Sequence, residues 1–346
     1  MSLTHKGVNY DTGTNYGASG ALSREVWRPE LARLEIQAIR DQLRCNAIGI
    51  FGTDVDRLAQ AASVALELGL YVWLQPRLVD ADPHQIVDHL ADAARAAEQL
   101  RRQYPAVNIN VGCELTIFSA GIIPGSTYRQ RAARLSSPRS WPLLPWYNHK
   151  LNALLARAVT VTRSHFHGQI TYGAGLWERV DWRPFDIVGL NYYRVRFNRR
   201  RYVANLRRYL RHGKPVVVAE FGCASFDGAV DKGPAAHEII DWSGSVPQIT
   251  GHYVRDEQVQ ADQIAELIGI YETEGIGGAF VFEFIEPSHP HSDDPRQDLD
   301  MAGYGIVKVL PDQGPGSYHW EPKAAFHTVA RLYESHSQTQ NRPSPR

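Results

Sequence analysis

Eight strand-like apolar runs recur along the chain, and helical patterns fill most of the gaps between them. Most of these runs are continuous rather than alternating, as expected of parallel strands that are covered on both faces. Strands that alternate with helices indicate an α/β fold. Eight such units predict a closed (β/α)8 TIM barrel. The runs are Gly7–Tyr10, Ala47–Phe51, Tyr71–Gln75, Val107–Gly112, Gln169–Tyr172, Asp186–Tyr192, Pro215–Ala219 and Gly278–Phe284.

The helical patterns support this alternation. A short segment between the fifth and sixth runs, Gly175–Pro184, is the weakest of them. The alternative fold is an open, doubly wound sheet, but no strand-like run is followed by a full G-x-G-x-x-G or a phosphate-binding loop. The helical segments are Asp54–Leu68, Asp82–Gln103, Lys150–Arg163, Val203–Arg211, Glu257–Glu274 and Pro322–Glu334.

The length allows one barrel with insertions, since the chain has 346 residues and a barrel usually takes about 250. Three long loops follow the fourth, seventh and eighth runs, at Ser119–Asn148, Gly222–Asp256 and Ile285–Trp320. Loops of this length are usually functional. We expect one domain over residues 1–334. The polar segment 335–346, rich in Pro and Ser towards its end, is expected to be disordered.

Charge and apolar patterning exclude several functional classes. Thirty-seven Lys and Arg balance thirty-seven Asp and Glu, so the chain lacks the overall basic field that drives non-specific nucleic-acid binding. No apolar run approaches the roughly 20 residues of a membrane span. The N-terminus lacks the pattern of a signal peptide. Cys45, Cys113 and Cys223 are expected to be buried free thiols, which favours the cytoplasm.

Two glutamates stand at or just past the ends of the fourth and seventh runs. Glu114 closely follows Val107–Gly112, and Glu220 follows Pro215–Ala219. A carboxylate at the end of a buried strand is costly unless it is paired or functional. Because the strand ends of a TIM barrel form its active site, both should lie at one mouth. Two facing carboxylates are what glycoside hydrolysis requires, one protonated and one ionised. The alternative is that each merely pairs with an arginine of the rim, such as Arg77 or Arg194.

Several segments resemble the TIM-barrel retaining glycoside hydrolases grouped as clan A. Gly213–Gly222 is similar to the strand that carries the nucleophile in that clan, and Phe185–Tyr193 is similar to its sixth strand. Tyr304–Val307 followed by Pro322–Phe326 is similar to its closing segment. The resemblance implies that Glu114 is the acid/base and Glu220 the nucleophile.

The sequence departs from the clan at three positions. Cys113 stands where the clan usually has the Asn that bonds the sugar 2-hydroxyl, and a thiol is a poor hydrogen-bonding group. The eighth run carries Glu283 where the clan often has Trp. Gly52–Asp54 contains no counterpart of the Arg that often ends the second strand. These departures predict unusual recognition of the reacting sugar.

Other residues near the strand ends are candidates for substrate binding. Tyr192 or Tyr193 could donate a hydrogen bond to Glu220, although packing in the core or rim explains either equally well. The full set of expected substrate-binding residues is Asn9, Asp11, Trp73, Gln75, Arg77, Cys113, Asn191, Tyr192, Tyr193 and Glu283.

Two further features have a simpler explanation than function. The loop His289–Asp294 mixes metal-capable side chains but matches no metal-binding pattern, so no metal is expected. Arg194–Lys214 holds eight arginines and one lysine, which a solvated helix face explains. An acidic or phosphate-bearing partner is the alternative.

Together, these observations predict a retaining glycoside hydrolase that acts on a carbohydrate, without a cofactor, nucleic acid or membrane as partner. One alternative is a non-catalytic barrel that binds a carbohydrate or another partner. The other is a barrel enzyme that uses the same carboxylates for different acid/base chemistry. Neither the sugar nor the oligomeric state follows from the sequence.

Overall fold

The eight expected strands form a closed parallel barrel in the computed structural model, which describes residues 3–17, 20–244, 246–314 and 316–340. Around the barrel the strand order is β1-β10-β7-β6-β5-β4-β3-β2. Closure leaves no exposed sheet edge. The prediction of a TIM barrel is therefore confirmed. The strands are β1 (His5–Asp11), β2 (Ala47–Gly52), β3 (Tyr71–Pro76), β4 (Val107–Cys113), β5 (Ile170–Ala174), β6 (Val188–Asn191), β7 (Val216–Phe221) and β10 (Gly278–Val281).

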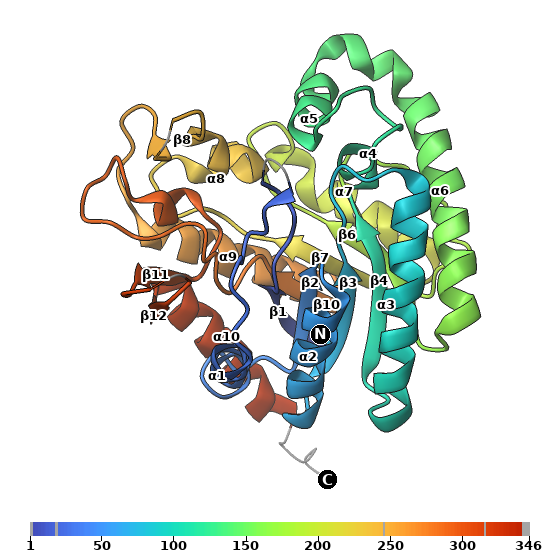
Figure 1. Cartoon of the computed structure of the whole chain (residues 1–346), viewed down its shortest axis with the longest axis horizontal. Coiled ribbons are helices and arrows are strands. Elements are labelled where there is room, and N and C mark those ends of the chain that lie inside the picture. Colours follow the sequence, from blue (N-terminus) through green and yellow to red (C-terminus); the bar gives the residue numbers. More distant parts are fainter. Residues whose placement is uncertain (1–2, 18–19, 245, 315, 341–346) are drawn as a thin grey trace.

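Helices surround the barrel, and Figure 1 shows α3 and α6 running along its outer side. Two of the helix starts follow directly from the sequence. The Asp54 side chain accepts hydrogen bonds from the backbone at the start of α2, and Asp82 and Gln85 form a capping box on α3. The principal helices are α1 (Pro29–Asp41), α2 (Val55–Glu67), α3 (Pro83–Gln103), α6 (Leu144–His165), α7 (Tyr202–Tyr209), α9 (Glu257–Thr273) and α10 (Ala324–Gln340).

The three long loops contain short elements. In Figure 1, α5 lies at the top, α8 and β8 lie at the upper left, and β11 and β12 lie at the left near α10. After β4 come α4 (Leu115–Phe118), α5 (Tyr128–Ser136) and η2 (Pro138–Leu143). After β7 come α8 (Ala229–Lys232), η5 (Gly233–Ile239) and the pair β8 (Ile240–Asp241) and β9 (Gln248–Ile249). After β10 come η6 (Leu299–Ala302), β11 (Val307–Pro311) and β12 (Tyr318–Pro322).

The structure differs from the expected elements in several places. Helix α6 begins at Leu144 rather than at Lys150, and β10 ends at Val281 rather than at Phe284. Helix α1 was not expected, and it begins without a side-chain cap that could have marked it.

The weak pattern at Gly175–Pro184 forms turns rather than a helix. Helix α10 continues to Gln340, past the expected end at residue 334, because no Gly or Pro interrupts the chain before Pro343. The rest of the expected disordered segment, 341–346, lies outside the described residues.

Other expectations can be compared with the structure. The three cysteines are buried and free, as expected.

The basic run Arg194–Lys214 forms η3 (Arg199–Arg201), α7 and η4 (Leu210–His212). Two of its arginines pair with helix α9 or its end, Arg194 with Glu266 and Arg207 with Glu274. None of the helices in the described segments combines the length and apolar character that a membrane crossing requires.

Candidate active site

Glu114 is held at the mouth of the barrel by backbone contacts on both sides. It follows the last residue of β4 in a left-handed conformation, with φ 45° and ψ 40°. A residue with a side chain rarely adopts this conformation unless its surroundings impose it. Its N–H donates to Gly173 O at 3.0 Å, and the next N–H, of Leu115, donates to the Tyr172 hydroxyl at 2.7 Å. The start of α4 thereby fixes the direction of the Glu114 side chain.

Glu178 completes this support. Its carboxylate accepts hydrogen bonds from the Thr116 N–H at 3.0 Å and from the Thr116 hydroxyl at 2.7 Å. It also accepts from the Tyr172 hydroxyl at 2.9 Å and from the Gly175 N–H at 3.0 Å. One buried carboxylate therefore ties α4 to the strand β5 and to the turn that follows it.

Glu220 lies on β7 and reaches the same mouth. It is only 6% exposed, and its carboxylate forms an ion pair with the Arg77 guanidinium at 2.5 Å. In the barrel register it stands opposite Asn191, the last residue of β6. Burial of a carboxylate is costly unless it is paired, so Arg77 makes this position tenable.

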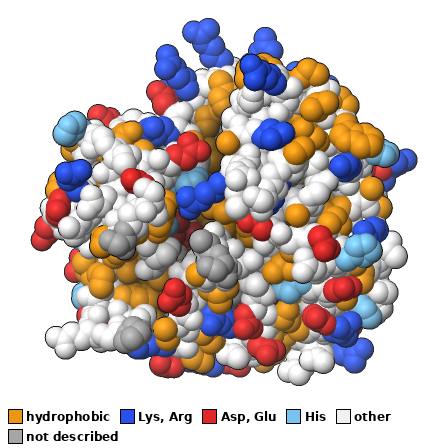
Figure 2. Space-filling view, turned by 45° about the horizontal axis from the view of Figure 1, so that its top comes forward, with side chains coloured by type: hydrophobic (Ala, Val, Ile, Leu, Met, Phe, Trp, Pro, Cys, Tyr) orange, Lys and Arg blue, Asp and Glu red, His pale blue; other side chains and the backbone are white. Residues whose placement is uncertain are grey.

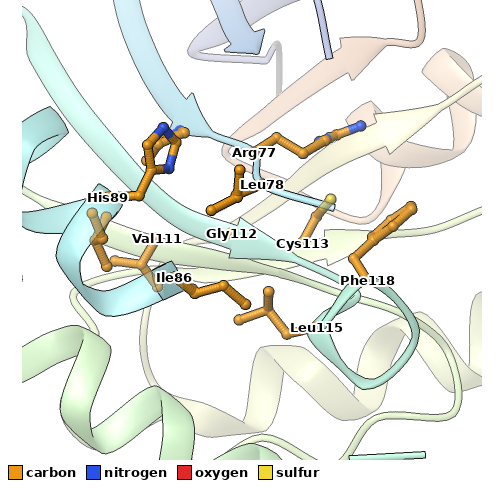
Figure 3. Close-up of a pocket in the computed structure, with 11 residues that line it drawn as sticks. Arg77, Leu78, Ile86, His89, Val111, Gly112, Cys113, Leu115 and Phe118 are labelled. Atoms are coloured by element: carbon orange, nitrogen blue, oxygen red, sulfur yellow. The ribbon is translucent and has the colours of Figure 1, made fainter. Parts of the chain in front are cut away.

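Arg77 is itself fixed on several sides. Its guanidinium lies 4.1 Å from the centre of the Phe51 ring and donates to Gln75 Oε1 at 3.0 Å and to the Tyr16 hydroxyl at 2.5 Å. Figure 3 shows the Arg77 guanidinium, the Cys113 thiol and the Phe118 ring on one side of a small cavity, away from His89 and Ile86. This packing aims the guanidinium at Glu220.

Asn191 connects the two glutamates. Its Nδ2 donates to Glu114 Oε1 at 3.2 Å. A second hydrogen bond from Asn191, together with one from Tyr193, lowers the pKa of Glu220. Because one amide group reaches both side chains, Glu114 and Glu220 face the same small volume.

The two glutamates differ in what surrounds their charge. Burial, followed by the charges of Glu220 and Glu178, raises the pKa of Glu114 to about 8. Burial also raises the pKa of Glu220, but the Arg77 charge and three hydrogen bonds oppose that rise. Glu114 is therefore protonated at neutral pH, and Glu220 has the partners that an ionised carboxylate needs.

A third carboxyl group, Glu283, lies just past the end of β10. It is 3% exposed, and the peptide bond that precedes it is cis. Phe282 N–H bonds Phe221 O at 2.7 Å and Phe284 N–H bonds Asn9 O at 2.9 Å, so Glu283 sits between β7 and β1. Burial, and then the charges of Glu286 and Asp11, raise its pKa well above the usual range.

Most of the residues expected at the site lie close to these carboxyl groups. Gln75, Cys113, Asn191 and Tyr193 interact with Arg77 or with the two glutamates. Asp11 supports the first loop, since its carboxylate accepts from the Gly13 N–H and the Thr14 hydroxyl, both at 2.9 Å.

Three of the expected residues are placed elsewhere. Trp73 packs inside the barrel against Phe280, one layer below the mouth. Asn9 also lies deeper, where its Nδ2 donates to Ala219 O at 2.9 Å. Tyr192 points outward and donates to Tyr202 O at 2.8 Å, because successive residues of a strand face opposite sides.

The structure also brings in residues that the sequence did not single out. Tyr16 and Phe51 contact Arg77, and Glu178 supports the segment that carries Glu114. Phe51 is the last residue of the predicted run Ala47–Phe51, so its place near a strand end could have indicated it. Tyr16 and Glu178 lie in loops, where no pattern in one sequence marks them.

The loops after β4, β7 and β10 meet above the mouth. The Arg129 guanidinium of α5 lies 5.9 Å from the centre of the Trp242 ring, and that ring contacts the His289 ring with centroids 5.7 Å apart. Figure 2 shows a hollow in this face, where basic, acidic and histidine side chains gather.

One cluster in these loops has metal-capable side chains, namely His291, Asp298 and Asp300. Asp298 and Asp300 both pair with Arg255, at 2.9 and 2.8 Å, and Asp300 also pairs with Lys323 at 2.7 Å. The two cations already balance the carboxylates, so ion pairing explains the cluster without a metal.

Solved structures of glycoside hydrolases share this architecture. A GH113 β-1,4-mannanase complex matches with a TM-score of 0.62 and 14% identity, over 97% of this chain and 100% of that one. The GH113 β-mannanase AaManA from Alicyclobacillus acidocaldarius matches with a TM-score of 0.59 and 18% identity, over 96% of this chain and 98% of that one.

The chain shares the TIM-barrel fold of these glycoside hydrolases. Bacteroides uniformis β-glucuronidase 2 matches as well, with a TM-score of 0.57 and 15% identity, over 96% of this chain but 35% of that one. No protein-family model matches the sequence, and no curated protein does. The similarity is therefore one of fold, and the chemistry has to be argued from the site.

Proposed function

We propose that this protein is a retaining glycoside hydrolase, with Glu114 as the acid/base and Glu220 as the nucleophile. The observation that supports this most is the contrast between two carboxyl groups that share Asn191. One is kept protonated by burial and by neighbouring carboxylates, and the other is paired with Arg77. Glycosidases separate the pKa values of their two carboxyl groups in this way.

In the first step, the Glu114 carboxyl gives its proton to the glycosidic oxygen as the bond from that oxygen to the anomeric carbon breaks. The Glu220 carboxylate forms a bond to the anomeric carbon, which leaves a glycosyl-enzyme ester and a free alcohol. As Glu220 loses its charge, Arg77 keeps its hydrogen bonds to Gln75 and Tyr16 and so stays in place.

In the second step, Glu114 is ionised and acts as a base. It takes a proton from a water molecule, whose oxygen attacks the anomeric carbon and displaces Glu220. Two displacements restore the original anomeric configuration. Asn191 can donate to whichever carboxylate carries the charge, because its Nδ2 group has two protons and lies between them.

The structure also accommodates the alternative noted from the sequence, that a rim arginine pairs with a glutamate. Arg77 does pair with Glu220, whereas Arg194 pairs with Glu266 on α9, away from the mouth. The Arg77 pair supports catalysis as well as structure, since a nucleophilic carboxylate must be ionised before it attacks.

The test is a pair of variants assayed on aryl glycosides with good and poor leaving groups. Glu220→Gly should lose nearly all turnover, and azide should restore part of it as the glycosyl azide of inverted configuration. Glu114→Ala should lose about 100-fold or more on poor leaving groups but much less on good ones, which depart without a proton. Glu321→Gln, an exposed change on β12, is the control. Wild-type turnover in both active-site variants would contradict the proposal.

A further inference from the structure

Glu283 carries an acidic group that the proposed mechanism does not use. Only 3% of the residue is exposed, yet no donor within the described residues reaches its Oε2 atom. The other carboxylates of the mouth have donors, such as the Gly13 N–H for Asp11 and the Arg77 guanidinium for Glu220. A buried polar atom of this kind is costly and calls for an explanation.

The surroundings of Glu283 are rich in negative charge. Glu286, Asp11 and Glu220 all lie near enough for their charges to raise the pKa of Glu283, and Arg77 is the cation that opposes them. Arg77 is already engaged with Glu220, Gln75 and Tyr16. The surroundings of Glu283 therefore combine an acceptor atom without a donor and a field that favours a cation.

We infer that Glu283 binds a protonated amine on the sugar that occupies the site, so that the enzyme takes amino sugars. This inference rests on the proposed function, because it assumes that the sugar lies beside Glu220. Glu283 stands between β7 and β1, and Phe282, its neighbour in the chain, bonds Phe221, the residue that follows Glu220. A ring held at Glu220 would therefore lie beside the segment that carries Glu283.

An amine accounts both for the Oε2 atom without a donor and for the negative charge around Glu283, whereas a hydroxyl accounts only for the first. A neutral hydroxyl would fill the hydrogen bond of Oε2 but would leave the surrounding carboxylates uncompensated. An ammonium group fills the bond and balances the charge, and charge-assisted hydrogen bonds are about twice as strong as neutral ones. A site built around such a pair rejects a ligand that lacks it, because its buried polar group is then left without a partner.

The experiment is calorimetric titration of the full chain at pH 7 with matched monosaccharides. The probes are glucosamine, galactosamine, mannosamine and 6-amino-6-deoxyglucose, each beside its neutral parent hexose. We expect at least one amine to bind about tenfold more tightly than its parent, which corresponds to about 1.4 kcal/mol. The N-acetyl derivative of a favoured 2-amino sugar should lose that advantage, because it carries no charge.

Variants identify the residue responsible. Glu283→Gln and Glu283→Leu should bring the amine and its parent to within about threefold of one another, since neither side chain is acidic. Asp293→Asn, an exposed change in the same connection after β10, should keep the preference. Both Glu283 variants should melt at or above the wild-type temperature, because each removes a poorly satisfied buried carboxyl.

The outcomes separate this inference from the proposed function. No preference for any amine in the wild-type protein, or a preference that survives in Glu283→Gln, would overturn the inference while leaving the roles of Glu114 and Glu220 intact. A preference that depends on Glu283, in a protein that hydrolyses no glycoside, would support the amine site and count against the proposed function.

Discussion

The Arg77 guanidinium lies 2.5 Å from the carboxylate of Glu220. Arg77 follows β3 and Glu220 lies on β7, so the pair joins opposite sides of the barrel. Both residues are almost fully buried, so neither charge is well solvated without the other. The Arg77 charge opposes the rise in the pKa of Glu220 that burial causes, and so favours the ionised form that the proposed nucleophile needs.

Replacing Arg77 should move the acidic limb of activity. Arg77→Gln removes the charge that lowers the pKa of Glu220, so that carboxyl should become protonated at higher pH. We expect the acidic limb of kcat/KM to shift upward and activity at pH 6 to fall by about 100-fold or more. Arg194→Gln is the control, because it removes a buried guanidinium that pairs with a glutamate of α9 rather than with Glu220. An unmoved acidic limb in Arg77→Gln would count against this role.

Glu178 should influence the alkaline limb through Glu114. The pKa of Glu114 is about 8, and the Glu178 charge is one of the causes that raise it. Glu178→Gln should therefore move the alkaline limb of kcat/KM to lower pH. Asp181→Asn, which removes a charge from the same connection between β5 and β6, should leave the limb where it is. A limb that moves to higher pH, or does not move, would show that Glu178 does not act on Glu114 by its charge.

Stability should fall as the pH rises, in a window set by Glu114. Its folded pKa is about 8 against an ordinary value of 4.5, so the folded protein holds this proton more tightly than the unfolded chain. The resulting stability is complete below about pH 4.5 and is lost by about pH 8. Between these pH values the Tm of the wild type should fall further than the Tm of Glu114→Gln. The difference between the two falls should be about 2–4 °C or more in calorimetric scans.

A control variant with the opposite shift is available on α3. Arg101 pairs with Glu98 and holds its pKa at about 2. The stability that Glu98 contributes is thus already complete above about pH 4.5, the ordinary value for its carboxyl. Glu98→Gln should lower Tm by the same amount across the window. A wild-type slope in Glu114→Gln would contradict the raised pKa of Glu114.

Cys113 should matter little to turnover. Burial raises the pKa of its thiol well above the ordinary value, so it is neutral and a poor nucleophile. We expect Cys113→Ala to keep kcat/KM within about tenfold of wild type, because a thiol gives a sugar little hydrogen bonding. Cys223→Ala, another buried free thiol, is the control. A loss as large as that of Glu220→Gly would instead mean that the thiol takes part in the chemistry.

Much of the fold was predictable because barrel strands are buried on both faces. Runs such as Ala47–Phe51 are therefore apolar throughout and stand out from the helices. Helix α1 was not predicted, since Arg28, the residue before its first turn, provides no side-chain cap. Helix α10 extends into the polar segment that was expected to be disordered, because a polar composition alone does not prevent a helix from continuing.

The sequence allowed site residues to be predicted only from their positions at the ends of predicted strands. Glu114 and Glu220 follow from their places at those ends, but the depth and the face of other residues do not. Trp73 and Gln75 point to the same side of β3, and only Gln75 reaches the layer of the mouth. Tyr193 faces Glu220 and Tyr192 faces the helices, an alternation whose phase one sequence leaves open.

The most direct test of the central claim is the position of the covalent bond in the glycosyl-enzyme. The protein is first matched to an aryl glycoside that it hydrolyses, and then incubated with the activated 2-deoxy-2-fluoro analogue of that sugar. Intact mass and peptide mass spectrometry then show where the sugar is attached. We predict one equivalent of sugar, on the carboxylate of Glu220. Attachment to any other residue, or no attachment in an enzyme that releases the inverted sugar, would contradict the account.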